Sequence, residues 1–289
     1  MSVEGRPQFS FFGVFDGHGG KLVAENSAKL NGLLAKIKAA PSWPLAEKDT
    51  EALKAAMIHG FIEQDKELRE VRCARARAAP HAAGSAWAAR PHARASHSRA
   101  PPRPAPPAPP STRPPPLPPR PTASPRRRRR LPQGQSMPNN EDHSGSTAVT
   151  AFVTPTHIVV ANCGDSRALL VGSDGSALFA SEDHKPYSDE EKRRIEGAGG
   201  TVSMKRVNGD LAVSRALGDF VYKQNKPDGS TLAPPDNQQV SCIPEVTIIE
   251  RRADMAFLLL CCDGIWDVMT NEQVARLVVE VRGAEEARP

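Results

Sequence analysis

A stretch of 68 residues, 71–138, constrains the fold more than any other part of this 289-residue sequence. It holds 14 arginines, 18 of the 28 prolines and no acidic residue. Branched apolar side chains are almost absent, so the stretch cannot bury enough surface to offset the entropy of ordering its backbone. We therefore expect a disordered Ala/Pro/Arg-rich insert at 71–138, which interrupts one domain made of residues 8–70 and 139–289.

Outside this insert the chain is acidic. Without the 14 arginines the formal net charge of +5 becomes −9, so a basic nucleic-acid-binding domain is disfavoured for the protein as a whole. Within the insert, the segment Arg113–Arg130 could bind a partner. Its polyproline part, 113–120, would suit an SH3-type groove, and its arginine run, 126–130, would suit a polyanion. The alternative is that 71–138 is a gene-model artefact, because translated GC-rich non-coding sequence has the same composition.

The cysteines and the apolar runs indicate a cellular compartment. Five cysteines without Cys-x-x-Cys spacing predict buried free thiols in a reducing compartment, with neither a disulfide framework nor a zinc site. The longest apolar run, 255–262, is far shorter than the ~20 residues that span a bilayer, and residues 9–15 lack the cleavage site of a signal peptide. We expect a monomer in the cytoplasm, the nucleus or both, without a membrane contact.

Apolar patterns outside the insert predict both helices and strands. Helical spacing of apolar residues predicts amphipathic helices at 22–37 and 53–68, and two further helices open with capping-box patterns at 188–191 and 270–273. The predicted strands are 9–15, 147–153, 158–163, 168–171, 177–180, 246–249 and 255–262. Helices at both ends and strands in the middle, without regular βαβ alternation, favour an α+β fold with a sheet core covered by helices.

Three of the predicted strands end in an aspartate, namely Asp16, Asp165 and Asp263. Carboxylates at the ends of core strands are desolvated and repel one another, so a positive group has to neutralise them. Aspartate carboxylates together with glycine carbonyls suit a hard cation such as Mg²⁺ or Mn²⁺ rather than Zn²⁺. The three strand ends therefore predict a divalent cation site.

Neighbouring residues extend this hypothesis. Asp267 lies four positions after Asp263, which places both on one face if a helical turn starts there. His18, next to a metal-binding aspartate, would suit a general acid, whereas a lone histidine is more often a structural hydrogen-bond donor. The alternative interpretation is that the aspartates cap helices and bind Arg167 or Arg215.

Six segments occur in a characteristic order. They are FGVFDGHGG at 12–20, GSTA at 145–148, NCGDSR at 162–167, DHKP at 183–186, VNGDLAVSRALGD at 207–219 and CDGIWDVM at 262–269. In this order they resemble the successive motifs of the metal-dependent (PPM, type 2C) protein Ser/Thr phosphatases, and the resemblance covers roughly residues 8–69 and 139–282. It implies a central antiparallel β-sandwich flanked by helices, and an enzyme that removes phosphate from phosphoserine and phosphothreonine in phosphoprotein substrates.

The resemblance also implies a binuclear Mg²⁺ or Mn²⁺ centre in a cleft at one edge of the sheets. By that resemblance Asp16 bridges the two ions, the carbonyl of Gly17 binds one ion and Asp263 binds the other. Asp165 and Asp267 match positions associated with a third, weaker ion. A water molecule activated by the two ions would attack the phosphorus directly, without a covalent phosphoenzyme.

His18 matches the family residue that is proposed to protonate the leaving alkoxide. Two family motifs are missing. One is an N-terminal strand with a phosphate-binding Arg and a Glu-Asp pair, which Glu4 and Arg6 do not match, and the other is a C-terminal Gly-x-x-Asp-Asn motif. We therefore expect a domain truncated at both ends, with edge strands left unpaired. Two hypotheses follow: an active phosphatase, or a catalytically silent PPM-like binding protein that uses the insert for interaction.

Overall fold

The computed structural model describes residues 2–3, 6–46, 49–78, 144–224 and 232–286. They belong to one compact unit, formed by Met1–Ala78 together with Asn140–Pro289. The rest of the predicted insert, beyond Ala78, lies outside the described residues, so its disorder and its binding role stay predictions. Among the described residues, no helix is both long and apolar enough to cross a bilayer.

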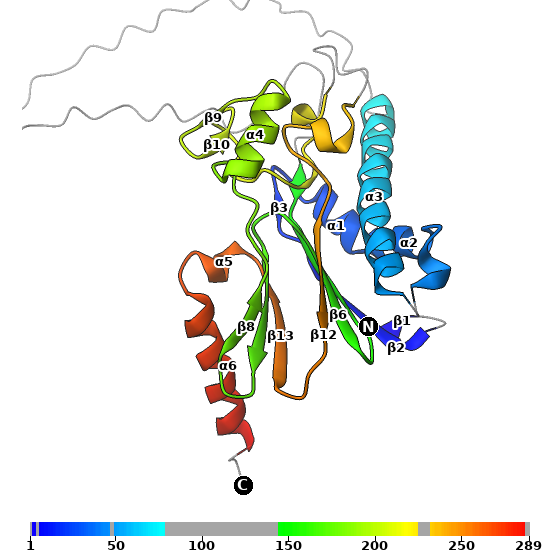
Figure 1. The fold of residues 1–289 in the computed structure, drawn as a ribbon. Helices are drawn as coiled ribbons and strands as arrows, with labels where there is room; N and C mark the ends of the chain where they lie inside the picture. Colours follow the sequence, from blue (N-terminus) through cyan, green and yellow to red (C-terminus); the bar gives the residue numbers. More distant parts are fainter. Residues whose placement is uncertain (1, 4–5, 47–48, 79–143, 225–231, 287–289) are drawn as a thin grey trace, which may run out of the picture. The chain divides into compact units, whose positions relative to one another are not determined.

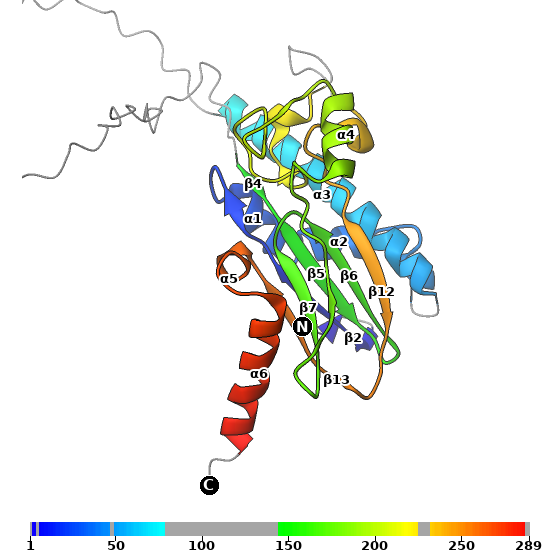
Figure 2. The same ribbon diagram turned by 60° about the vertical axis from the view of Figure 1, so that its left-hand side comes forward.

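Two antiparallel sheets form the centre of this unit (Figures 1 and 2). The larger sheet has the strand order β1-β2-β5-β6-β12 and the smaller has the order β13-β7-β8. The strands of the larger sheet are β1 (Ser2–Val3), β2 (Arg6–Val14), β5 (Ala148–Val153), β6 (His157–Cys163) and β12 (Glu245–Glu250). Those of the smaller sheet are β13 (Met255–Cys261), β7 (Arg167–Gly172) and β8 (Ala177–Ala180). Every strand expected from the sequence is therefore present, with bounds shifted by three residues at most.

The strands alternate their apolar side chains between two cores. In β5, Val149 and Ala151 pack between the two sheets, where they meet Leu170 of β7, whereas Ala148 and Phe152 pack on the opposite face. Successive side chains of a strand point to opposite faces of the sheet, so a strand that is apolar at every position needs cover on both. The continuous burial of β5 therefore requires a helical layer outside the larger sheet.

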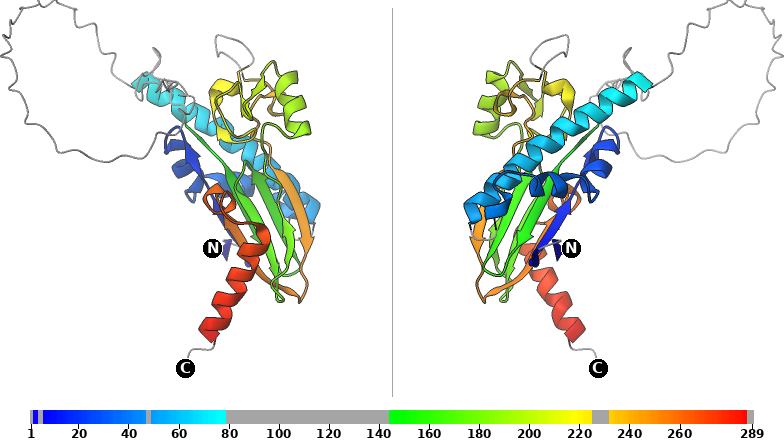
Figure 3. Two further views of the ribbon diagram at one scale, coloured as in Figure 1. Left: turned by 90° about the vertical axis from the view of Figure 1, so that its left-hand side faces the viewer. Right: turned by 90° about the vertical axis from the view of Figure 1, so that its right-hand side faces the viewer.

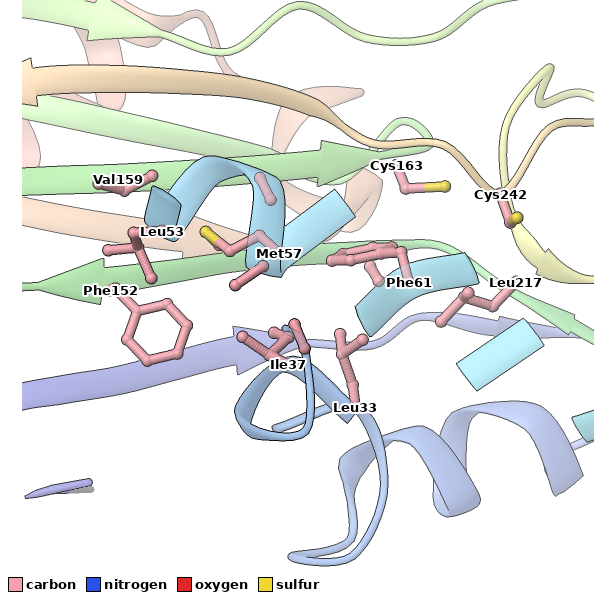
Figure 4. Close-up of a cluster of buried hydrophobic side chains, with 14 of the residues drawn as sticks. Leu33, Ile37, Leu53, Met57, Phe61, Phe152, Val159, Cys163, Leu217 and Cys242 are labelled. Atoms are coloured by element: carbon pink, nitrogen blue, oxygen red, sulfur yellow. The ribbon is translucent and has the colours of Figure 1, made fainter. Parts of the chain in front are cut away.

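Three helices provide that layer. They are α1 (Leu22–Ala28), α2 (Leu33–Lys38) and α3 (Thr50–Ala78), with the 3₁₀ turn η1 (Trp43–Leu45) between the last two. Figure 3 shows α3 lying diagonally across the strands. In the core drawn in Figure 4, Leu53, Met57 and Phe61 of α3 pack with Phe152 of β5 and Val159 of β6, and all five side chains are fully buried. The apolar face predicted for this helix is thus the face that contacts the sheet.

The helix predicted at 22–37 is wrong in one respect, because the chain forms two helices there. α1 ends at Ala28 and α2 begins at Leu33, and Leu30, expected on the apolar face, is 71% exposed in the connection. At Gly32 the backbone passes so close to α1 that a Cβ would lie 2.6 Å from the carbonyl oxygen of Ser27. Glycine therefore permits a turn that leucine spacing alone did not reveal.

The start of the predicted insert is also corrected. α3 continues through residues 71–78 to Ala78, inside the segment for which we expected no structure. These residues are mostly alanine and arginine, which have high helix propensity, and the first proline of the insert is Pro80. Low apolar content predicted disorder here, but an existing helix can be extended by residues that could not start one.

The smaller sheet is covered by α5 (Asp263–Trp266) and α6 (Asn271–Glu286). α6 starts with the predicted capping box: the Thr270 N–H donates to Gln273 Oε1 at 2.8 Å, and the Gln273 N–H donates to Thr270 Oγ1 at 3.3 Å. The capping box predicted for α4 (Asp189–Gly197) is wrong, because the Ser188 hydroxyl donates to the Lys185 carbonyl instead. The acid of that pattern, Glu191, binds arginines of the fold.

Two of the four cysteines whose side chains the structure describes match the prediction of buried free thiols, and the other two are more exposed than predicted. Cys163 and Cys242 are buried free thiols, and Cys261 and Cys262 are free and partly buried. Burial raises the pKa of Cys163 to about 12, so its thiol stays protonated at neutral pH. The side chain of Cys73 is outside the described part of the chain.

Candidate functional site

Three strand ends bring acidic side chains to one pocket. Asp16 follows β2 and Asp165 follows β6. Asp263 follows β13 and is the first residue of α5. All three line a pocket of about 210 Å³, together with His18 and Thr147. The remaining lining residues lie between positions 206 and 213 and are Arg206, Leu211, Ala212 and Val213. The structure therefore brings together at one pocket the three aspartates that the sequence singled out.

Asp16 and Asp263 form the tightest acidic group. One carboxylate oxygen of each lies within 4.8 Å of the other and of the Cys262 sulfur. Burial raises the pKa of the Asp263 carboxyl, and the negative charges of Asp16 and Asp267 raise it further. Two carboxylates held this close repel each other unless they share a proton or a cation, so the pair has the electrostatics of a cation site.

Asp267 lies one helical turn beyond Asp263. Its N–H donates to the Asp263 carbonyl oxygen at 2.8 Å, as the four-residue spacing predicted. The Asp267 side chain is exposed, and it acts on Asp263 through its charge rather than from the wall of the pocket. The structure thus places Asp267 beside the Asp16–Asp263 pair.

Asp165 is buried and is paired with a lysine side chain. Its side chain is 7% exposed, and Lys185 Nζ donates to its Oδ2 at 2.6 Å. Burial raises the pKa of Asp165, and the hydrogen bond from Lys185 offsets part of that rise. The preceding Gly164 has φ +120 and packs against Thr147, a backbone conformation that L side chains rarely adopt.

Gly17 and His18 form the short strand β3 (Gly17–His18). It lies at one edge of a small sheet with the order β11-β4-β3, which also contains β4 (Gly145–Ser146) and β11 (Leu217–Gly218). Gly17 pairs with Ser146 and His18 pairs with Gly145. A Cβ at Gly145 would collide with both the His18 ring and the Asp219 carboxylate, so glycine at this position allows those two groups to meet.

His18 has an acidic partner. Its Nε2 lies 2.6 Å from Oδ2 of Asp219, whose side chain is 3% exposed. Burial alone would lower the pKa of His18, but the hydrogen bond and charge of Asp219 outweigh it and raise the pKa overall. The pocket therefore favours the protonated imidazolium form, which can donate a proton.

A second buried ion pair holds the segment that carries Asp219. Lys223 is fully buried, and its Nζ donates to Asp65 Oδ1 of α3 and to the Ala216 carbonyl oxygen, each at 2.8 Å. The same Asp65 oxygen accepts the N–H of Gly218 at 2.8 Å. α3 is thus bound through Asp65 to the backbone immediately before Asp219.

The alternative that arginines neutralise the strand-end aspartates is contradicted. Arg167 makes a bidentate pair with Asp183 at 2.9 and 3.0 Å. Arg215 donates twice to Glu191, at 3.0 and 2.7 Å. The same alternative held that the aspartates cap helices. This is wrong at α5, because Cys262 occupies the N-cap position and no side chain caps the helix.

Sequence reasoning missed four residues that the structure places at the site. Lys185 and Asp219 lie in segments that the sequence had singled out, but nothing in the spacing showed that they pair with Asp165 and His18. Arg206 lines the pocket from β10 (Arg206–Val207), which forms a hairpin with β9 (Val202–Ser203). Cys262 was interpreted as a buried thiol, and only its position before Asp263 hinted at its place in the acidic group.

Several proteins of known sequence resemble this chain. It is 50% identical over 141 residues to "Protein phosphatase ppm-1.A" of Caenorhabditis elegans, an alignment that covers 48% of this chain and 29% of that protein. It is 51% identical over 140 residues to human "Protein phosphatase 1B" (48% and 28% covered) and 51% identical over 138 residues to human "Protein phosphatase 1A" (47% and 35%). The chain thus spans about a third of the length of these curated relatives.

Solved structures support the fold. Serine-threonine phosphatase 2C from Toxoplasma gondii matches with a TM-score of 0.62 and 20% identity, over 98% of this chain and 77% of that one. A sex determining protein of C. elegans matches with a TM-score of 0.58 and 20% identity, over 94% and 47%. The predicted α+β fold, with an antiparallel sandwich flanked by helices, is therefore confirmed.

The family model described as protein phosphatase 2C matches residues 122–288, which is more than half of the chain. The matched range contains five of the six sequence motifs and two of the three strand-end aspartates, Asp165 and Asp263. The chain belongs to the protein phosphatase 2C family.

Proposed function

We propose that this chain hydrolyses phosphoserine and phosphothreonine in phosphoprotein substrates, using divalent cations bound by its strand-end aspartates. One observation carries the proposal: the Asp16 and Asp263 carboxylates lie within 4.8 Å of each other in a pocket that also contains His18 and Arg206. Relatives that are about 50% identical are named protein phosphatases, which supports the same activity.

The donor set fits Mg²⁺ or Mn²⁺. Asp16 and Asp263 would supply carboxylate oxygens, and Gly17, the residue after Asp16, would supply its carbonyl oxygen. Hard cations prefer such oxygen ligands. The raised pKa of Asp263 supports this fit, since burial first, and then the charges of Asp16 and Asp267, disfavour its unpaired carboxylate. In the proposed centre Asp16, the carbonyl of Gly17 and Asp263 would hold the two ions.

Two bound cations supply Lewis-acid activation of a water molecule and neutralise charge on the phosphate. The protein's own side chains contribute the remaining steps. Arg206 lines the pocket as a cation, so its guanidinium is suited to orient the phosphate. Asp219 raises the pKa of His18 and so favours its protonated form, and His18 would then donate its proton to the alkoxide of serine or threonine as that group leaves.

The test is phosphatase activity of the purified full chain on a phosphothreonine peptide, with and without millimolar Mn²⁺. We expect Mn²⁺-dependent turnover that Asp263→Ala lowers by about 100-fold or more, since a metal clamp contributes several kcal/mol to the barrier. Asp254→Ala is the matched control, because Asp254 is about half exposed in the connection between β12 and β13 and pairs only locally with Arg252.

Unchanged turnover in Asp263→Ala would refute the proposed centre. A wild-type chain that is folded but shows no turnover would instead favour the silent binding protein. Replacing the peptide by p-nitrophenyl phosphate tests His18 separately, because that leaving group needs no proton. We expect His18→Ala to lose activity on the peptide but to keep most of its activity on the aryl ester.

A further inference from the structure

The hairpin of β9 and β10 ends in a two-residue turn next to a residue of the acidic pocket. Arg206 is the register partner of Ser203, so Met204 and Lys205 form the turn. Both have positive φ, +50 and +63, as a type I′ turn of a two-residue hairpin requires. Glycine and asparagine are the usual residues there, because L side chains are strained in this conformation. The turn thus holds a methionine and a lysine where the backbone alone would favour smaller residues.

Asn208 fixes the base of this hairpin. Its N–H donates to the Thr201 carbonyl oxygen at 2.7 Å, and its Oδ1 accepts the Thr201 N–H at 2.9 Å. Its Nδ2 donates to Gln239 Oε1 at 2.8 Å. Within the hairpin, Nη1 of Arg206 donates to the Asp210 carbonyl oxygen at 2.6 Å. The turn is therefore carried by a hydrogen-bonded frame.

Lys205 is held by an aromatic ring. Its Nζ lies 5.1 Å from the centre of the Tyr187 ring, within the range of a cation–π interaction, and Tyr187 is 49% exposed. Tyr187 stands two positions after Lys185, which binds Asp165 of the pocket, and Lys205 directly precedes Arg206, which lines the pocket. The contact joins two segments that each reach the pocket, and it places the Lys205 ammonium group beside it.

This ammonium group keeps its positive charge available. In the described part of the chain, no carboxylate forms an ion pair with Lys205 or with Arg206. An aromatic ring attracts a cation through its quadrupole and does not neutralise it. Lys185 and Arg167, by contrast, are each paired with an aspartate. Two successive cations are thus left for an anionic ligand, one lining the pocket and one beside it.

We propose that Lys205 binds a second anionic group of the substrate, close in sequence to the phosphorylated residue, an inference that rests on the proposed phosphatase function. A phosphate in the pocket meets Arg206, and an extended peptide advances by about 3.4 Å per residue, so a group a few residues away comes within reach of Lys205. A carboxylate and a second phosphate share the chemistry that this site recognises. Tyr187 is a positioning residue, since it holds the ammonium group without neutralising it.

The experiment compares kcat/KM of the full chain on phosphothreonine peptides in the presence of Mn²⁺. The peptides carry glutamate, glutamine or a non-hydrolysable phosphonate analogue of phosphoserine, two residues before or two residues after the phosphothreonine. On at least one side we expect glutamate or the phosphonate to be preferred over glutamine by about threefold or more, as for an exposed ion pair. The preference should shrink in 0.5 M KCl, because salt screens exposed charges. A preference for the phosphonate alone would identify a second phosphate as the recognised group.

Substitutions separate Lys205 from its surroundings. Lys205→Glu should abolish the preference or invert it toward a peptide with lysine at the same position, and Lys205→Gln, a milder change, should abolish it. Tyr187→Leu should weaken the preference, whereas Tyr187→Phe should keep it, because the ring holds the ammonium group. Lys54→Glu is the matched control: it makes the same charge change near the start of α3, at a residue that does not line the pocket, and should keep the wild-type preference.

The inference is overturned if the wild-type chain shows no preference on either side, if both Lys205 variants keep it, or if Lys54→Glu loses it equally. Equal preferences in Tyr187→Leu and Tyr187→Phe would refute the role of Tyr187. Failure of the proposed function looks different, because fluorescence anisotropy of the same peptides with a phosphonate in place of the phosphothreonine needs no turnover. An inactive chain that still binds the glutamate peptide more tightly through Lys205 would refute the phosphatase function alone, and one that does not would refute both.

Discussion

Replacing Lys223 by methionine tests how strongly the buried ion pair beneath the site stabilises the fold. Lys223 is fully buried, and its Nζ lies 2.8 Å from Oδ1 of Asp65, whose side chain is 4% exposed. Methionine preserves most of the volume of the lysine stem, so the change removes mainly the charge and its hydrogen bonds. Asp65 would then keep one donor, the Gly218 N–H, and would have no cationic partner at this contact.

Breaking a buried pair by removing one partner costs about 3–5 kcal/mol. Because Asp65 keeps the Gly218 hydrogen bond, we expect the lower end of this range, about 3 kcal/mol of unfolding free energy. For a domain of this size, each kcal/mol lowers Tm by about 2–4 °C, which gives a shift of roughly 6–12 °C. The double variant Asp65→Leu/Lys223→Met should lose less than Lys223→Met alone, since no unpaired charge remains.

The effect should depend on pH, with a defined sign. Burial raises the pKa of Asp65, and Lys223 offsets part of that rise, so its removal raises the pKa further. An acid whose folded pKa lies above its unfolded pKa destabilises the fold at high pH, and the penalty vanishes as the pH falls. The stability deficit of Lys223→Met should therefore be smaller at pH 5 than at pH 7.5.

Urea unfolding followed by circular dichroism, at both pH values, measures these differences. The m-value should stay constant across the variants if both states keep their compactness. A deficit below about 1 kcal/mol, or a double variant as unstable as the sum of its single variants, would show that Lys223 and Asp65 are not coupled. Either result would refute the reasoning.

Three further perturbations test the fold. Thr270→Ala removes half of the capping box of α6 and should cost about 1 kcal/mol, measured as a lower Tm. Arg215→Ala should cost about 2 kcal/mol of unfolding free energy at pH 7. Hydrogen bonds and charges from its arginine partners outweigh burial and lower the pKa of Glu191 to about 2. The ion pair therefore stabilises the fold fully above about pH 4.5 and loses this effect as the pH falls toward 2. Urea titrations at pH 7 and 3.5 should therefore show a smaller deficit at the lower pH. Phe61→Ala leaves a cavity under the larger sheet and should cost about 3–5 kcal/mol in the same assay, and a loss below 1 kcal/mol would contradict the packing in Figure 4.

The strands and the acidic centre were predictable because their signals are local. Each strand is a short apolar run, and an aspartate at the end of such a run has few explanations other than a functional role. The capping box at Thr270 is equally local, since its two partners stand three positions apart. The one at Ser188 failed because Glu191 finds Arg215, 24 positions away, and a bidentate arginine outweighs a single backbone N–H.

What the sequence did not reveal are pairings between distant loops. Lys185 meets Asp165 from 20 positions away, and His18 meets Asp219 from 201 positions away. The His18 contact depends on the pairing of β3 with β4 and on the close approach that Gly145 permits. The Lys185 contact depends on the hydrogen bonds that join Gly164 to His184. The break at Gly32 was missed for a related reason, because the proximity of α1 decides it and leucine spacing does not.

The proposed metal centre also bears on how the chain folds. Asp16 stands at the end of a strand of the larger sheet and Asp263 at the end of a strand of the smaller sheet, near opposite ends of the chain. Contacts between such distant positions form late, because their loop-closure entropy is paid before they stabilise anything. Mutual repulsion of the two acids opposes that last step, and a divalent cation bound at the proposed centre would relieve it. Cations that bind only the assembled sandwich favour it over the unfolded chain by mass action, so the ligand of the centre would also act as a late folding partner.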